Sequence, residues 1–336
     1  MFRIPLLSLT AMTVLSALPA APVPKEAVKP TGILVLDDCD PLYEGKSEYD
    51  DNLTLLDSAG KKSFRISGFN NCQSVCSGRA IAADVSRDCI WVVENVANRI
   101  RRFDRTGKVT LSIADVNGTA IAVDPVTGHV WALVGEGRIG SGKVVVYDGK
   151  GKAVATHDIS GFDIVYDRKA KAFWIAEKNL TKVDAATGKV LSSTEISTWG
   201  AAMVDVDPKS GAAWVAVRKH PDVKLSENRL LKFDADGKEL TSIDLEEKDP
   251  FRVSVDPKDG SVWLAKLHKS ILHYSGDGKF NAEHVVEALA VQVDPAGGDV
   301  WVVTTSDVQK MSPQGKTTAK LAHAGKAAMA WITTLE

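Results

Sequence analysis

Two carboxylates and a guanidinium stand at equivalent points of a repeated sequence unit: Asp163, Asp205 and Arg252. Each lies two or four residues before the Asp of a recurring turn, and Gln292 has the same place in the next unit. Residues two apart on a strand share one face, so we expect these side chains to gather. Asp163 and Asp205 could hold calcium or magnesium, which prefer oxygen ligands. The full set could instead bind a small anionic or polar ligand, or simply form a satisfied ion pair in a water-filled channel.

A second group of polar and aromatic residues is expected near the same channel. Glu94 and Glu177 each follow a recurring Trp by three residues, where a carboxylate could act as an electrostatic helper or base at the channel rim. The loop after Glu94 has turn-forming residues, so a purely structural role is the alternative. Trp199 lies outside the Trp repeat, in a connection between units. It could anchor a sugar or a protein, or plug the channel mouth.

The elements that position these residues follow from a tryptophan repeat. Six Trp residues stand in similar apolar runs, at positions 91, 131, 174, 214, 263 and 301. Their spacings of 40, 43, 40, 49 and 38 residues match the period of a propeller blade. No stretch of the sequence has a sustained helical period, so an all-β architecture is indicated.

Each unit predicts four short strands. A unit opens with an apolar strand such as MVDVD (203–207), turns through Asp-Pro-x-x-Gly, and continues with the Trp strand. Proline presets φ at one turn position and glycine accepts φ values that other residues avoid, so this motif predicts a tight hairpin. A third strand, a Gly-Lys hairpin and a fourth strand complete the unit. The first strand is expected to line the central channel.

The two ends of the chain predict the number of blades. Residues 32–67 contain three strands without a first strand, and residues 325–336 supply a first strand without the other three. Their pairing predicts a seven-bladed β-propeller of four-stranded antiparallel blades, closed by the C-terminal strand on the N-terminal blade. Closure would remove exposed sheet edges. A six-bladed ring with residues 32–78 as an appendage is the alternative.

Long loops on one face predict a binding surface. Residues 37–52, 135–142 and 218–228 are longer than the unit needs and leave the same face as Trp199. Long loops on a rigid scaffold commonly carry binding residues. We therefore expect a protein, glycan or small-molecule partner at this loop face.

The N-terminal residues predict export. Residues 1–21 combine an Arg, a short apolar stretch and small residues, in the order of a secretory signal peptide. Residues 22–31 are expected to be a flexible lead-in, and residues 32–336 a single propeller domain. The destination would be periplasmic or extracellular, where a disulfide between Cys39 and either Cys72 or Cys76 could form. Cys89 is expected to be a buried thiol, and the alternative is that all four cysteines stay reduced.

Composition limits the possible partners. The 336 residues carry a net charge of −2, which gives no basic field for nucleic acid. No apolar stretch after the signal would span a membrane, and a closed ring needs no partner for stability. We expect a monomer.

The repeats resemble NHL, YVTN and streptogramin-lyase-like propellers. IWVVENVANRIRRFDRTGKVTLSI (90–113) is similar to the NHL phrase of a strand, an Asn-Arg loop and Phe-Asp-x-x-Gly-Lys, and the similarity extends over about residues 79–323. Propellers of the gluconolactonase family bind a divalent cation through Glu, Asn and Asp, and streptogramin lyases use histidines with magnesium. The seven histidines here fall at different points of the unit, which departs from the lyase pattern. The resemblance thus implies the fold, with two functional hypotheses: a binding scaffold, or a divalent-metal-dependent hydrolase or lyase at the channel mouth.

Overall fold

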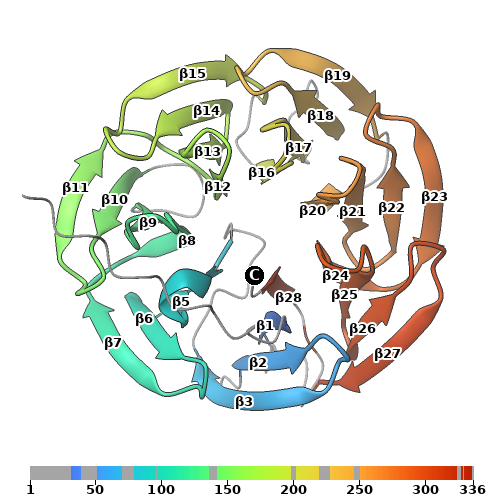
Figure 1. Cartoon of the computed structure of the whole chain (residues 1–336), viewed down its shortest axis with the longest axis horizontal. Coiled ribbons are helices and arrows are strands. Elements are labelled where there is room, and N and C mark those ends of the chain that lie inside the picture. Colours follow the sequence, from blue (N-terminus) through green and yellow to red (C-terminus); the bar gives the residue numbers. More distant parts are fainter. Residues whose placement is uncertain are drawn as a thin grey trace, which may run out of the picture. The chain divides into compact units, whose positions relative to one another are not determined.

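Seven four-stranded antiparallel sheets form the described part of the chain, arranged as blades around a centre (Figure 1). The computed structural model describes residues 32–38, 51–69, 79–95, 97–135, 142–197, 202–218, 228–245, 250–323, 327 and 329–334. The prediction of a seven-bladed, all-β propeller is confirmed. The only helical element of the described residues is a single 3₁₀ turn, η2 (Val85–Arg87).

The strands take four radial positions in each blade. The innermost strands are β4 (Ile81–Asp84), β8 (Gly118–Val123), β12 (Asp163–Asp167), β16 (Ala202–Val206), β20 (Pro250–Val255), β24 (Ala288–Val293) and β28 (Met329–Thr334). The second strands are β5 (Cys89–Glu94), β9 (Val130–Val134), β13 (Ala172–Ala176), β17 (Ala213–Val217), β21 (Val262–Lys266), β25 (Val300–Thr304) and β1 (Gly32–Asp38). The third strands are β6 (Arg99–Asp104), β10 (Lys143–Tyr147), β14 (Asn179–Asp184), β18 (Arg229–Phe233), β22 (Ser270–Tyr274), β26 (Asp307–Met311) and β2 (Asp51–Asp57). The outermost strands are β7 (Val109–Ala114), β11 (Ala153–His157), β15 (Val190–Glu195), β19 (Glu239–Asp244), β23 (Phe280–Val285), β27 (Thr317–Ala322) and β3 (Lys62–Phe69). Blades 1 to 6 begin with β4, β8, β12, β16, β20 and β24, and blade 7 is the composite β28-β1-β2-β3.

Blade 7 is closed as the sequence predicts. Strand β28 pairs antiparallel with β1, with Val35 opposite Ile332. A buried contact then joins blade 7 to blade 6, because His323 Nδ1 lies 3.2 Å from Asp37 Oδ2. The other ring nitrogen of His323 is 3.0 Å from the carbonyl oxygen of Thr304. The six-bladed alternative is therefore excluded.

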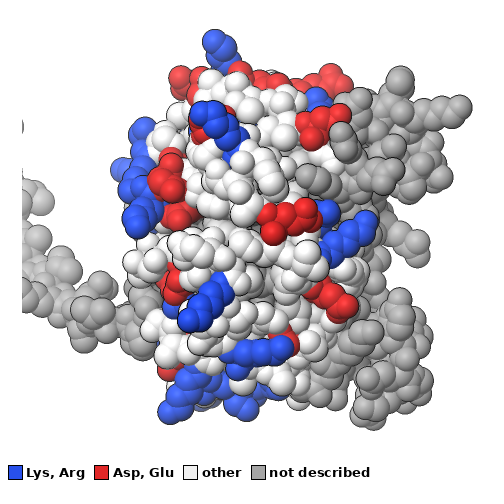
Figure 2. Space-filling view, turned by 90° about the vertical axis from the view of Figure 1, so that its right-hand side faces the viewer, with Lys and Arg blue, Asp and Glu red and all other residues white. Residues whose placement is uncertain are grey.

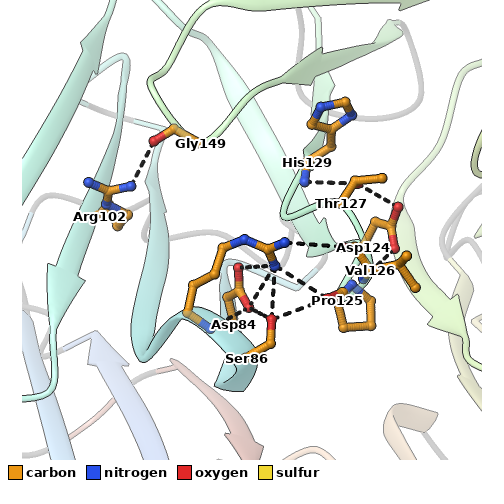
Figure 3. Close-up of polar contacts among 10 residues, drawn as sticks. Asp84, Ser86, Arg102, Asp124, Pro125, Val126, Thr127, His129 and Gly149 are labelled. Carbon is orange, nitrogen blue, oxygen red and sulfur yellow. Dashed lines mark hydrogen bonds and ion pairs between the residues drawn. The ribbon is translucent and has the colours of Figure 1, made fainter. Parts of the chain in front are cut away.

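The Asp-Pro-x-x-Gly motifs form the hairpins between first and second strands, as in blade 2 (Figure 3). The Asp124 carboxylate accepts hydrogen bonds from Val126 N–H at 2.9 Å and from Thr127 Oγ1 at 2.6 Å. Gly128 closes the turn at φ +74°, a conformation that favours glycine. We call the side of the ring with these turns the hairpin face, and the side with the connections between blades the loop face.

Apolar cores lie between neighbouring blades. One cluster combines Trp91 and Ile100 of blade 1 with Ile121 and Val130 of blade 2. All six repeated Trp residues are at most 2% exposed. Packing a large ring between two sheets removes much apolar area from water, which explains why the period of the sequence is carried by Trp.

Cations on the third strands reinforce these joints. Four of them lie over a Trp ring of their own blade: Arg102 on Trp91, Lys182 on Trp174, Lys232 on Trp214 and Lys310 on Trp301. Each also donates to a hairpin carbonyl of the next blade: Arg102 to Gly149, Lys182 to Ala235, Lys232 to Gly276 and Lys310 to Ser58. The first of these contacts is visible in Figure 3. One side chain thus combines a cation–π contact with a hydrogen bond between blades.

Histidines pack between blades at two other interfaces, between blades 2 and 3 and between blades 5 and 6. His157 stacks on Trp131 at a centroid distance of 5.2 Å, and His284 on Trp263 at 5.8 Å. Each ring lies against a hairpin glycine of the following blade, so closely that a Cβ atom on that glycine would overlap it. Burial lowers the pKa of His273, which stacks on Trp263 at 4.1 Å.

Charges of both signs are interspersed over the described part of the side drawn in Figure 2. This distribution is in keeping with the net charge of −2. Among the residues described, no helix has the length and apolar character needed to cross a membrane.

Candidate functional site

The first site residue, Asp163, begins β12 and is 2% exposed. Its Oδ1 accepts a hydrogen bond from the backbone N–H of Arg79 at 2.9 Å, and its Oδ2 accepts one from Val204 N–H at 3.1 Å. Arg79 lies two residues before β4 of blade 1, and Val204 lies on β16 of blade 4. One carboxylate therefore joins three blades.

Asp205 and Ser254 repeat this arrangement on the next two blades. Asp205 Oδ2 accepts from Val255 N–H at 2.9 Å, and Ser254 Oγ accepts from Val293 N–H at 3.0 Å. Gln292 donates to the same Ser254 hydroxyl at 3.1 Å. Asp205 and Ser254, each on an innermost strand, thus provide a hydrogen-bond acceptor for a backbone N–H of the next blade.

These contacts have a clear physical cause. An innermost strand has one edge paired within its blade and one edge toward the channel, where its N–H groups have no sheet partner. A buried N–H needs an acceptor. The polar residues of blades 3 to 5 supply that acceptor, which explains why they interrupt an apolar strand.

Two arginines complete the charged floor of the channel. Arg79 Nη2 donates to the Val204 carbonyl at 3.1 Å and lies 3.7 Å from Asp205 Oδ1, while its Nε lies 3.9 Å from Asp163 Oδ1. Arg252 is 8% exposed, and its Nη1 lies 3.1 Å from the Met203 sulfur. Its guanidinium is also 4.6 Å from the centre of the Phe251 ring.

Burial dominates the electrostatics of the floor. It raises the pKa of Asp205 above its usual value, against the opposing pull of Arg79. It also lowers the pKa of Arg252 to about 10, so this guanidinium is still charged at neutral pH. The floor thus holds opposite charges close together in a poorly solvated place.

A cavity of about 390 Å³ opens from this floor to the hairpin face, and we call it the funnel. Its deep part is lined by Arg79, Asp205 and Gln292. Its mouth is ringed by the turn prolines Pro208, Pro257 and Pro295, with Tyr166 and Arg168 of blade 3 and Thr333 and Thr334 of blade 7. A narrower cavity of about 20 Å³ lies beyond, between Arg79, Asp163, Met203 and Arg252.

The structure brings together the sequence-predicted set Asp163, Asp205, Arg252 and Gln292 around these two cavities. The use of Asp163 and Asp205 as metal ligands stays a prediction. The Arg79 guanidinium lies beside both carboxylates, in the position that a cation would take between them. Within the described ranges, no group of three or more His, Cys, Asp or Glu residues is arranged to hold a metal ion.

Glu94 and Glu177 do not line either cavity. Glu94 is fully buried, accepts from Arg99 at 2.8 Å and also pairs with Arg101 on the neighbouring strand. Glu177 is 5% exposed, and its N–H donates to the Asn179 carbonyl at 3.0 Å. The rim role of Glu94 and Glu177 stays a prediction, and the described contacts pair the Glu94 carboxylate with arginines of the adjacent strand.

Several predicted residues lie outside the described part of the chain. These are Trp199 and the cysteines Cys39, Cys72 and Cys76, together with most of the loops 37–52, 135–142 and 218–228. The loop-face surface and the disulfide stay predictions. Cys89 is free and buried, as expected.

Arg79 is the central residue that sequence reasoning missed. It lies five residues before the turn Asp84, one step outside the two aligned columns of the first strand. Its partners are 84 and 125 residues away in the chain. The available signal was an Arg just before a strand whose first residues are small and apolar.

No protein-family model matches the chain, and no curated protein matches it in sequence. The NHL or YVTN type of the repeat therefore stays a prediction, whereas the propeller architecture rests on the strand topology.

Proposed function

We propose that the protein is an exported β-propeller that binds a small polar ligand in the funnel. The observation that carries this proposal is the funnel itself, whose 390 Å³ falls in the range of small-molecule sites, about 300–1,000 Å³. Its wall combines prolines and valines with a small number of polar groups, among them Arg79, Asp205 and Gln292. The fold is compatible with a binding scaffold or an enzyme, and the funnel favours binding.

Export is supported by the sequence of residues 1–21. In this proposal the processed protein meets its ligand in the periplasm or outside the cell. A protein or glycan partner on the loop face, through Trp199 and the long loops, is a separate proposal that the funnel does not require.

A matched pair of tryptophan variants tests the funnel. Thermal unfolding of the processed protein is measured with small molecules of each charge class, and binding is expected to raise the midpoint. Thr334→Trp places a ring in the funnel and should abolish the shift, whereas Thr318→Trp, on the exposed surface of β27, should retain it. Equal shifts in both variants would contradict binding in the funnel.

A divalent-metal hydrolase or lyase is the alternative from a different class. It is tested by unfolding the protein in EDTA and then with calcium, magnesium or manganese. Metal bound by Asp163 and Asp205 should raise the midpoint for one ion, and Asp163→Asn and Asp205→Asn should both remove the rise. No response to any ion would reject the metal site.

A further inference from the structure

We infer that the ligand of the funnel is a small monocarboxylate with an apolar body, and that Arg79 binds its carboxylate. This inference rests on the proposed function, because it assigns a chemical class to the same cavity. Three observations support it. Arg79 has unused hydrogen-bond donors, the carboxylates of Asp163 and Asp205 already accept backbone N–H groups, and part of the funnel wall is apolar.

Arg79 has donor capacity left at the point where the two cavities meet. It lines both of them, and its side chain is 20% exposed. Its buried Nε has no hydrogen-bond partner among the described residues, and the donated contact of its guanidinium goes to a backbone carbonyl, that of Val204. A guanidinium presents five N–H donors in a planar fork that matches a carboxylate. Because Nε is buried, an acceptor entering the funnel would bind the exposed part of the guanidinium.

The carboxylates of Asp163 and Asp205 do not take this role. They lie 3.9 and 3.7 Å from the guanidinium nitrogens, beyond hydrogen-bond length. Asp163 uses both oxygens, and Asp205 one, to accept backbone N–H groups of other blades. They neutralise part of the charge of Arg79 while leaving its fork open to a further acceptor.

The same carboxylates limit the charge of the ligand. A dianion such as phosphate beside Arg79 would lie close to both, and like charges at short range in a poorly solvated site repel strongly. A single carboxylate gains two charge-assisted hydrogen bonds at a smaller repulsion.

The wall of the funnel accounts for the apolar body. Pro208, Pro257 and Pro295 ring the mouth, and valines from blades 3 to 6 lie between them and the floor. Arg168, Thr333 and Thr334 make the rest of the wall polar. A ligand that places its carboxylate at the floor therefore has its remaining atoms against the apolar side formed by these prolines and valines. A flat ring or a short branched chain would fit the available volume.

The test compares three compounds of similar shape, benzoate, benzamide and benzylamine, and adds inorganic phosphate as the dianion, all at constant ionic strength. Calorimetry measures their dissociation constants with the processed protein. Benzoate is expected to bind at least tenfold more tightly than benzamide, because only the carboxylate forms charge-assisted bonds with Arg79. Phosphate and benzylamine are expected to bind more weakly than benzamide.

Two variants assign the effect to Arg79. Arg79→Gln should weaken benzoate at least tenfold while leaving benzamide nearly unchanged. Arg87→Gln is the matched control, since Arg87 also donates to carbonyls of another blade, those of Pro125 and Val126, but does not line the funnel. If Arg79→Gln does not fold, Thr334→Trp provides the second test, and it should abolish benzoate binding.

The outcomes separate the inference from the proposed function. Binding of benzamide or benzylamine that exceeds benzoate and is lost in Thr334→Trp would overturn the carboxylate class and keep the funnel as a site. Benzoate binding that survives both Arg79→Gln and Thr334→Trp would also overturn the inference. No binding by any compound would reject the ligand class, whereas the funnel as a site is decided by the comparison of Thr334→Trp with Thr318→Trp.

Discussion

Removal of the Asp163 carboxylate should destabilise the propeller without any metal present. In Asp163→Ala, the backbone N–H groups of Arg79 and Val204 lose their acceptor. An unsatisfied buried N–H costs about 1–3 kcal/mol, so two such groups cost about 2–6 kcal/mol. The variant is also relieved of a buried charge, and we therefore expect a net decrease of about 3 kcal/mol in the free energy of unfolding.

The decrease is measured by urea denaturation followed by tryptophan fluorescence, in EDTA and again with calcium. Ser254→Ala removes one neutral acceptor, that of Val293 N–H, and should cost about 1 kcal/mol. Asp236→Ala, at an exposed turn position, should change stability by less than about 0.5 kcal/mol. The reasoning is refuted if Asp163→Ala is as stable as Asp236→Ala, or if its deficit appears only when calcium is present.

Three further predictions follow from burial and from backbone conformation. Gly188→Ala should cost about 2–4 kcal/mol in urea denaturation, because the residue has φ +69° and its new Cβ would overlap His157; a neutral result would show that the joint can open. Cys89 should resist iodoacetamide in the native protein at pH 8, because burial raises its pKa to about 11 and leaves about one thiolate in a thousand. Peptide mass spectrometry checks this, and labelling before denaturation would contradict it. Burial also raises the pKa of Asp205, so the folded state favours the neutral form of this carboxyl group. The stabilisation of the folded protein by the protonated group is complete below about pH 4 and is lost as pH rises through the raised pKa. Asp205→Asn should therefore gain stability relative to the unaltered protein as pH rises from 4 to 7, and a difference that does not change with pH would argue against it.

Local signals were sufficient to predict the blades. Each repeat contains its own hairpins, and the glycine of Asp-Pro-x-x-Gly has positive φ, as Gly128 and Gly211 show. The Trp column predicts the core because each ring packs within its blade and against the next. The composite blade could also be predicted from the sequence, because the incomplete unit at the N-terminal end lacks the one strand that the C-terminal end supplies.

The candidate site was harder to predict because its contacts run across the ring. The position of Asp163 on the channel side follows from the alternation of β12, but its partners Arg79 and Val204 are on blades 1 and 4. Alignment within a repeat compares equivalent residues and cannot pair unlike ones from different blades. Glu94 is the opposite case, because its partner Arg99 is only five residues away along the chain.

The wall of the funnel depends on the pairing of β28 with β1. Thr333 and Thr334 belong to a strand that hydrogen-bonds to one made almost three hundred residues earlier. During synthesis, blades 1 to 6 can form one after another, but β1 must wait for its neighbour. Ligand binding would therefore report completion of the ring, and a chain cut before β28 would carry every charged residue of the floor without having a functional site.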